Sequence, residues 1–319
     1  MKQLFADMHC DTITTLYDKI KNGSRDTLLC NSLQLDIQKM EQSHYLLQNF
    51  AVFFDKDVQG NLLEEALLRI AFFQEELKKN KYRIRQVTTY EEIMQNEKDG
   101  LISALLTLEG GESLEGNVDN LVLFHKKGVR MITLTWNHDN ELGYSHFDTR
   151  GNGLTKFGME MVERMEELHI IPDVSHGSDT LFYDVCKIAK KPFTASHSNA
   201  RSVYDRSRNM SDDMIRRLAE RGGVIGINFF AGFTSIRSRE NDMCYMEDIL
   251  QHMKYIKNVG GIDCLALGSD FDGIGTDVEW QDAGGMMQLL QGMQKAGFTA
   301  SECDKIIRDN VLRLYKECL

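Results

Sequence analysis

The sequence predicts an α/β fold, a (β/α)8 barrel, and three observations lead to this prediction. Eight short apolar segments recur along the chain, and the stretches between them carry helical periodicity. Ionisable side chains follow most of the apolar segments directly. The chain of 319 residues has a length that α/β barrels often reach as one domain, so we expect a single domain over residues 1–319.

Each expected strand is an apolar run of five to eight residues. The eight runs are residues 4–9, 48–54, 101–108, 129–135, 169–174, 192–196, 223–230 and 264–269. Helices are expected between them, for example over residues 61–80 and over 156–168, where Phe157, Met161 and Met165 recur at helical spacing. A doubly wound open sheet is the competing fold.

Composition indicates which kinds of partner and which cellular compartment to expect. The net charge is -11, and an acidic surface repels phosphate backbones, so we expect no nucleic-acid partner. The start of the chain has no apolar core of a signal peptide, and the most apolar internal stretch is too short to span a bilayer, so no membrane partner is expected. Seven scattered cysteines without a C-x-x-C pair indicate a reduced, cytoplasmic protein.

Candidate site residues stand just after the expected strands. In a barrel the carboxyl ends of the strands meet on one face, where barrel enzymes place their active sites. The residues in question are His9, Asp11, Glu109, His138, His176, His197 and Asp270. Five other histidines stand away from the strand ends and are given no role in the site; they are His44, His125, His146, His169 and His252.

Taken singly, each of these motifs has an ordinary structural explanation. A His-x-Asp is more often a capped turn than a ligand set, the glycines after Glu109 suit unusual backbone angles, and "SDFDG" reads as a turn. Together, three histidines and two carboxylates on one rim can hold two divalent cations. Imidazole and carboxylate without thiolate favour Zn²⁺, with Mn²⁺ or Co²⁺ also possible.

The segment "FADMHCD" places Asp7, His9 and Asp11 two residues apart. On a strand these side chains share one face, so His9 and Asp11 are expected to reach one ion, with Asp7 deeper and supporting a ligand histidine. Two ions ~3.5–4 Å apart can share a hydroxide and polarise a carbonyl, which suits hydrolysis of an amide or ester. Asp270 is the remaining rim carboxylate, available for acid–base work.

At these residues the chain resembles the membrane (renal) dipeptidase family of zinc peptidases, over nearly its whole length. The matching segments are His9-Cys10-Asp11, "EGG" at 109–111, "DVSH" at 173–176, "ASHSNARSVYDRSRNMSDD" at 195–213 and "GSDFDG" at 268–273. The step of 21 residues from His176 to His197, and the step of 11 residues from there to Arg208, also match the family pattern.

The resemblance implies a barrel of the metal-dependent hydrolase type with two Zn²⁺ per chain. One ion would be held by His9, Asp11 and Glu109, and the other by Glu109, His176 and His197. Arg208 would bind the free carboxylate of a dipeptide, and Asp270 would handle the proton. Members cleave dipeptides, including those with a C-terminal D-residue, and often form dimers, so a homodimer is a possible partner.

One position departs from the family pattern. Members commonly have a histidine directly after the "LTLT" strand, where it contacts the reacting carbonyl, but this chain has Trp136 there. His138, two residues later, is our candidate for this catalytic and substrate-binding role, with Asn137 or a water as alternatives. Secreted members of the family are attached to a membrane, and we do not extend this expectation to the present chain.

Two rival functions stay open. A metal-dependent amidohydrolase acting on a lactone, a phosphoester, another ester or a non-peptide amide is one, although such enzymes usually carry H-x-H after the first strand where this chain has H-x-D. A non-catalytic barrel that keeps its metal to bind a peptide is the other, and the presence of Asp270 and Arg208 counts against it.

Overall fold

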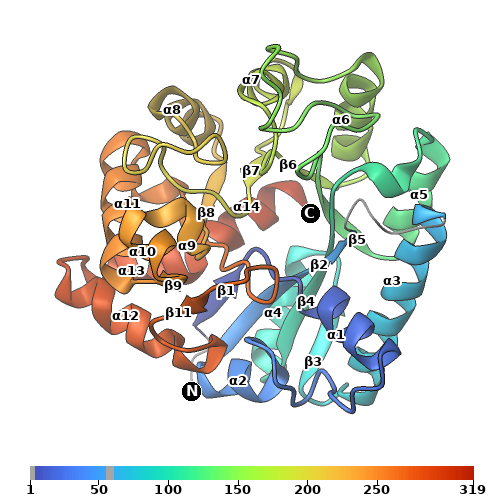
Figure 1. The fold of residues 1–319 in the computed structure, drawn as a ribbon. Coiled ribbons are helices and arrows are strands. Elements are labelled where there is room, and N and C mark those ends of the chain that lie inside the picture. The colour runs from blue at the N-terminus through green and yellow to red at the C-terminus, as the bar shows by residue number, and fades with distance from the viewer. Residues whose placement is uncertain (1–3, 55–60) are drawn as a thin grey trace.

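The computed structural model describes residues 4–54 and 61–319, and the chain forms a closed barrel of parallel strands surrounded by helices (Figure 1). Around the barrel the strands are β1 (Phe5–Asp7), β2 (Tyr45–Phe53), β4 (Ile102–Glu109), β5 (Val129–Thr133), β6 (Ile171–Asp173), β7 (Thr194–Ala195), β8 (Val224–Ile227) and β10 (Leu265–Leu267). Pairing of β10 with β1 and of β2 with β4 closes the ring. The predicted barrel is therefore confirmed, and each of the eight predicted strands corresponds to one of these.

A further strand, β3 (Ile84–Val87), was not expected from the sequence. It pairs with the first half of β4, from Ile102 to Leu105, whereas β5 pairs with the second half of β4. Its two central residues are polar and at least partly exposed, so the segment lacks the apolar run that marked the others. A separate two-stranded sheet joins β9 (Met243–Cys244) to β11 (Asp277–Val278).

Helices follow the strands and cover the outside of the barrel. They are α1 (Thr12–Lys21), α2 (Ile37–Gln42), α3 (Leu62–Lys79), α4 (Tyr90–Asp99), α5 (Val118–Lys126), α6 (Lys156–Glu167), α7 (Asp179–Ile188), α8 (Asp212–Glu220), α9 (Ala231–Thr234), α10 (Ile236–Glu240), α11 (Met246–Gly260), α12 (Met286–Lys295), α13 (Ala300–Asp304) and α14 (Asn310–Cys318). Single turns of 3₁₀ helix span Glu112–Leu114, Ile262–Cys264 and Ala283–Gly285, and Lys305–Asp309 forms a π turn.

Local sequence explains where the helices near the site begin. The side chains of Thr155, Ser178 and Ser211 accept hydrogen bonds from backbone amides at the starts of α6, α7 and α8. Such N-caps satisfy amides that the helix itself leaves free. They therefore fix the residue at which each loop above the barrel ends. Met161 and Met165 of α6 are buried, as the helical spacing predicted.

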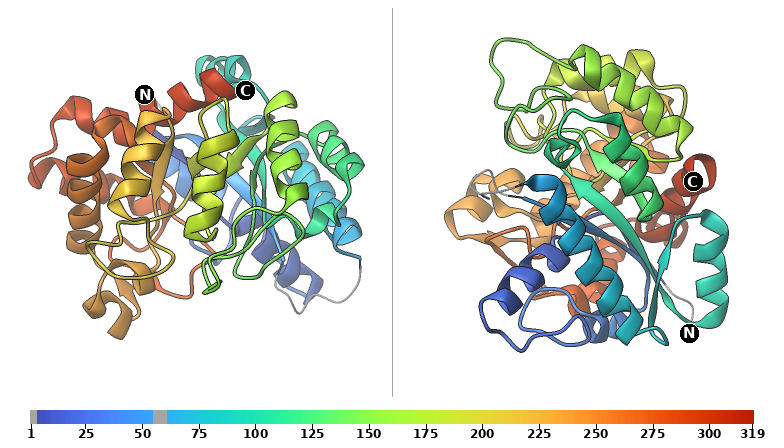
Figure 2. Two further views of the ribbon diagram at one scale, coloured as in Figure 1. Left: turned by 90° about the horizontal axis from the view of Figure 1, so that it is seen from above. Right: turned by 90° about the vertical axis from the view of Figure 1, so that its right-hand side faces the viewer.

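The two ends of the barrel differ. The C-terminal helix α14 lies at one end, and the loops that follow β5 and β7 lie at the other (Figure 2). Tyr315 of α14 is fully buried and exchanges hydrogen bonds with Asn49 of β2, from hydroxyl to amide oxygen at 2.9 Å and from amide nitrogen to hydroxyl at 2.7 Å. Helix α14 thus covers one end of the barrel, which leaves the carboxyl ends of the strands for chemistry.

Within residues 4–54 and 61–319, no helix has the length and apolar character that a membrane crossing requires.

Candidate metal centre

The site residues come from the carboxyl ends of five barrel strands. Glu109 is the last residue of β4, and His9 and Asp11 follow β1. The others follow β6, β7 and β10, namely His176, His197 and Asp270. The structure brings all six together, and every one of them is buried or nearly so.

The first strand is shorter than the sequence predicted. It ends at Asp7, so His9 and Asp11 lie in the turn beyond it rather than on one face of the strand. At this point Asp7 Oδ1 accepts the backbone N–H of His9 at 3.2 Å and of Ser269 at 3.0 Å, so these two amides bond a side chain instead of a neighbouring strand. Asp7 thus holds a candidate ligand through its backbone amide, and no hydrogen bond joins its carboxylate to an imidazole in the described part of the chain.

Glu109 faces two separate sets of side chains with its two carboxylate oxygens. Its Oε1 lies 3.0 Å from Nε2 of His176 and 3.2 Å from Nε2 of His197. Its Oε2 lies 3.7 Å from Nε2 of His9. A carboxylate whose oxygens point to different donor sets has the geometry needed to bridge two cations.

The set around His9 contains two further carboxylates. His9 Nε2 lies 3.5 Å from Asp11 Oδ2 and 3.8 Å from Asp270 Oδ1. His9 Nε2 and Asp11 Oδ1 are buried without a hydrogen-bond partner in the described structure. Leaving a buried polar atom unpaired costs ~1–3 kcal/mol, so these atoms indicate a ligand that satisfies them.

In the second set, supporting side chains fix which ring nitrogen carries the proton. Ser196 donates its one hydroxyl hydrogen to Asp173 at 2.5 Å, so His197 Nδ1, 2.7 Å from that hydroxyl, must donate to it. His176 Nδ1 lies 2.8 Å from the amide oxygen of Asn137, which can only accept. In both rings Nδ1 therefore holds the proton and Nε2 presents a lone pair.

The two Nε2 lone pairs then face each other across 2.9 Å. Burial lowers the pKa of His176 and of His197 well below the usual value, so neither ring readily takes a second proton. Two facing lone pairs repel, and a cation between them and Glu109 would turn that repulsion into coordination. The donor set, imidazole and carboxylate with no thiolate, fits a borderline divalent metal such as zinc.

The pKa shifts of the buried carboxylates and of His9 also indicate a site for cations. Burial raises the pKa of Glu109, and the charge of Asp11 raises it further while His9 opposes the shift. Burial also raises the pKa of Asp270. Burial works to lower the pKa of His9, but the carboxylates of Glu109 and Asp11 outweigh it and raise that pKa well above normal. The centre thus has an excess of negative charge that cations would neutralise.

Two site residues adopt backbone angles that are unfavourable for side chains. His176 has φ 66° and Asp270 has φ 64°, both in the left-handed region. Such a residue costs ~1–3 kcal/mol and persists only where the surrounding structure fixes it. Here the backbone amide of Asp270 donates to His9 O at 3.1 Å, and His176 O accepts from the amide of His146 at 2.7 Å.

Gly273 is a site residue that the sequence reasoning did not single out. A Cβ at this position would lie 2.0 Å from Asp11 Oδ2 and 2.7 Å from Asp270 Oδ1. A side chain here would therefore displace both carboxylates. The signal in the sequence was the glycine that ends "GSDFDG". Because this segment was interpreted as a turn, the glycine needed no further explanation.

Arg208 lies in the same region and is 4% exposed. Its guanidinium donates to Ser198 Oγ at 3.1 Å and to His197 O at 3.0 Å, while Nε has no partner in the described residues. Burial lowers the pKa of Arg208 to about 10, against the opposing effect of the Asp270 and Glu109 carboxylates. A buried cation with an unused donor beside the cluster is suited to binding an anion.

The structure does not bring His138 to the cluster. Its ring lies edge-on to Trp136 at 5.3 Å between centroids, and it lines a neighbouring cavity of about 310 Å³ with Asn137, Phe147 and Arg150. Trp136 packs on Phe53 at 4.6 Å. A catalytic role for His138 stays a prediction.

His146 is one of the five histidines that were given no role in the site, and the structure places it beside the cluster. Its ring lies 6.1 Å from that of His176, and its Nε2 is 3.0 Å from Asn137 Oδ1. The residue belongs to the long connection between β5 and α6, whose path periodicity does not predict. The side chain reaches the cluster because this connection folds back over the turn that carries His176.

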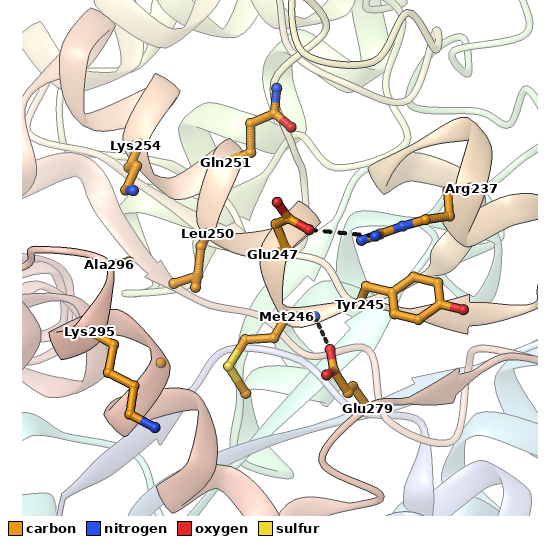
Figure 3. A pocket seen from close by; sticks show the side chains of 11 residues that line it. Arg237, Tyr245, Met246, Glu247, Leu250, Gln251, Lys254, Glu279, Lys295 and Ala296 are labelled. Atoms are coloured by element: carbon orange, nitrogen blue, oxygen red, sulfur yellow. Dashed lines mark hydrogen bonds and ion pairs between the residues drawn. The ribbon is translucent and has the colours of Figure 1, made fainter.

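The cavity with the greatest volume among those described, about 640 Å³, lies elsewhere. It is lined by residues of α10, α11 and α12 together with Tyr245 and Glu279, and it contains none of the site residues (Figure 3). Two of its polar contacts are the ion pair of Arg237 with Glu247 and the hydrogen bond that Glu279 accepts from the backbone amide of Met246. Cavity size therefore does not locate the chemistry of this protein.

Known proteins are similar to this chain in sequence and in fold. The sequence model of the membrane dipeptidase family, peptidase family M19, matches residues 1–318. Dipeptidase 3 of Macaca fascicularis is 26% identical over 98% of this chain, and the match covers 64% of that protein. The crystal structure of dipeptidase AC, a metallopeptidase of family M19, is 25% identical with a TM-score of 0.90, covering 100% of this chain and 99% of that one.

A second solved structure is similar in fold. It is a metallopeptidase from Rhodobacter sphaeroides bound to a phosphinate mimic of the dipeptide L-Ala-D-Ala, 23% identical with a TM-score of 0.91 and complete coverage of both chains. The predicted resemblance is thereby confirmed. With a family model that matches residues 1–318, the chain belongs to the membrane dipeptidase family of metallopeptidases, family M19.

Proposed function

We propose that the protein is a zinc-dependent dipeptidase with two Zn²⁺ ions per chain. The observation that carries the proposal is the division of the Glu109 carboxylate between two donor sets, with His176 and His197 at one oxygen and His9 at the other. His9, Asp11 and Glu109 would hold one ion, and Glu109, His176 and His197 the other. When bound, the ions would supply a water of lowered pKa as nucleophile and a Lewis acid for the carbonyl.

The substrate is proposed to be a dipeptide with a free C-terminal carboxylate. Arg208 would bind that carboxylate, because a buried guanidinium with an unpartnered Nε pairs strongly with an anion. The family relationship extends the proposal to dipeptides with a C-terminal D-residue, and the mimic bound in the Rhodobacter sphaeroides enzyme has this configuration.

Asp270 is proposed to move the proton. Its Oδ2 accepts a hydrogen bond from Asn228 Nδ2 at 2.8 Å, which holds the carboxyl group in place, and Oδ1 faces His9. Burial raises its pKa, and this favours the protonated form that a leaving amine requires. His138 is retained as a proposed contact to the substrate from its neighbouring cavity.

Three wider proposals accompany this assignment. We propose that residues 1–319 act as one catalytic domain, because all candidate ligands come from one barrel. We propose a cytoplasmic location from the unpaired cysteines, six of which are buried. A homodimer is proposed from the family relationship.

Hydrolysis of L-Ala-D-Ala and L-Ala-L-Ala, measured with and without a chelator, tests the function. We expect activity in the purified protein, loss after chelation and recovery on addition of Zn²⁺, because the proposed nucleophile is a water whose pKa the bound metal lowers. An unaltered rate after complete metal removal would contradict the proposal. Binding of dipeptides without hydrolysis would support the non-catalytic barrel, and cleavage of lactones or esters but not dipeptides would support the amidohydrolase alternative.

Arg208→Lys is expected to raise KM for dipeptides by about 10-fold or more while kcat changes less. The lysine keeps the charge but loses the planar fork that donates to Ser198 and to an anion together. Steady-state kinetics on free dipeptides and on their C-terminal amides would measure this. If the wild type cleaves dipeptide amides as well as the free acids, Arg208 does not bind the carboxylate.

A further inference from the structure

Asn137 is the meeting point of two histidines. Its amide oxygen lies 2.8 Å from His176 Nδ1 and 3.0 Å from His146 Nε2. An amide oxygen has two lone pairs and can only accept, so each ring donates an N–H to it. Both acceptor positions of the oxygen are filled, and this fixes which end of the amide faces His176.

The second ring is held by a partner of its own. Burial lowers the pKa of His146 to about 3, and in the neutral ring with Nε2 donating, Nδ1 accepts from Ser207 Oγ, which lies 2.8 Å away. The four groups therefore form a chain of defined direction, from the Ser207 hydroxyl to His146, from His146 to Asn137, and from His176 to the same oxygen of Asn137. The donors of Ser207, His146 and His176 in this chain each meet an acceptor.

Backbone contacts fix the register of the connection that carries His146. The amide of His146 donates to His176 O at 2.7 Å, and Ser145 forms an antiparallel bridge with Gly177. Ser178 N also donates to Tyr144 O at 3.0 Å. The loop is thus paired with the turn that holds the candidate ligand, where His176 has a left-handed backbone.

The neighbouring candidate ligand, His197, is held by a different chain of hydrogen bonds. His197 Nδ1 donates to Ser196, which donates to the carboxylate of Asp173, so a negative charge ends that chain. The chain behind His176 contains an amide, an imidazole and a hydroxyl. A charged partner raises the basicity of a ligand imidazole more than a neutral partner does.

We infer that Asn137 and His146 are positioning residues for one metal ion, the ion held by Glu109, His176 and His197. By accepting from Nδ1, Asn137 holds His176 in the tautomer that presents Nε2 to that ion, and His146 holds Asn137. Removing such a partner typically costs ~10–100-fold in metal affinity. The inference rests on the proposed metal centre and is independent of the substrate.

The test measures metal binding without substrate. Wild-type protein, Asn137→Ala, Asn137→Asp and His146→Ala are stripped of metal, and Zn²⁺ affinity is measured by competition with a coloured chelator. We expect Asn137→Ala to weaken one of the two ions by about 10–100-fold and to leave the other unchanged. Asn137→Asp, which keeps the acceptor and adds a charge, should bind that ion at least as tightly as the wild type, and His146→Ala should show a smaller loss.

Matched controls exclude a general effect of the substitutions. Asn258 on α11 and His125 on α5 lie outside the site, and their alanine variants should bind both ions as the wild type does. The visible spectrum of the Co²⁺-loaded protein should change in Asn137→Ala and recover in Asn137→Asp. Equal affinity of Asn137→Ala and wild type for both ions would overturn the inference, whereas a wild type that binds no ion would instead remove the proposed centre itself.

Discussion

Replacement of Glu109 by alanine is expected to remove both metal ions and to abolish hydrolysis. Its two oxygens face different sets, at 3.0 Å from His176 Nε2 on one side and 3.7 Å from His9 Nε2 on the other. Losing the shared carboxylate leaves each ion with two protein ligands instead of three. Metal analysis after gel filtration should fall from close to two Zn²⁺ per chain to less than one, since tight protein zinc sites keep at least three protein ligands.

His9→Ala is the matched comparison, because His9 Nε2 faces Glu109 Oε2, while the His9 ring only stacks on that of His197, at 3.8 Å between centroids. We expect this variant to lose mainly one ion and to keep the ion at His176 and His197. Thermal unfolding in excess chelator separates metal loss from misfolding. Without metal, Glu109→Ala should be at least as stable as the wild type, because it removes one of several crowded buried carboxylates. Full zinc content in Glu109→Ala would show that Glu109 is not the bridge.

The barrel could be predicted because its strands are marked by apolar runs followed by polar residues. That pattern arises from burial on both faces of a parallel strand and from the meeting of strand ends at one rim. β3 does not follow it, because Arg85 and Gln86 lie at least partly exposed beside β4 and need no apolar run. Strand ends were also harder to place, since two backbone amides near the end of β1 donate to the Asp7 carboxylate instead of to a neighbouring strand.

Sequence position predicted the candidate ligands better than it predicted the groups around them. His176 and His197 follow strands directly, so the fold alone carries them to the rim. His138 and His146 both lie in the connection after β5, where no periodicity fixes the path. The antiparallel bridge between Ser145 and Gly177 brings His146, and not His138, next to the turn of His176. That contact depends on the folded turn rather than on local sequence.

Asp270→Asn is expected to keep both zinc ions and the affinity for dipeptides while kcat falls by ~10²–10⁴-fold. The amide oxygen can still accept from Asn228 Nδ2, which lies 2.8 Å from Oδ2, so the group stays in place. What the amide cannot do is take or give the proton that the leaving amine requires. Burial raises the pKa of the native carboxyl group, and the variant removes that acid alone.

The serious alternative is that Asp270 is itself a ligand. Its Oδ1 lies 3.8 Å from His9 Nε2, and donor atoms of His9, Asp11 and Asp270 lie close enough together to hold an ion. Bound zinc, inhibitor affinity and kcat, measured on one preparation, decide between the two roles. Loss of an ion together with activity would make Asp270 a ligand, and the proton would then have to come from another group, for which His138 is the candidate.

Asp272 provides the control for this experiment, two residues further along the same turn. Its Oδ2 accepts from Thr12 Oγ1 at 2.6 Å and its Oδ1 from the backbone amide of Gln34 at 2.6 Å. An asparagine can accept from Gln34 and donate to the Thr12 hydroxyl, so Asp272→Asn should keep its metal and most of its kcat. Equal loss of kcat in both variants, with zinc retained, would assign the effect to the turn and not to proton transfer by Asp270.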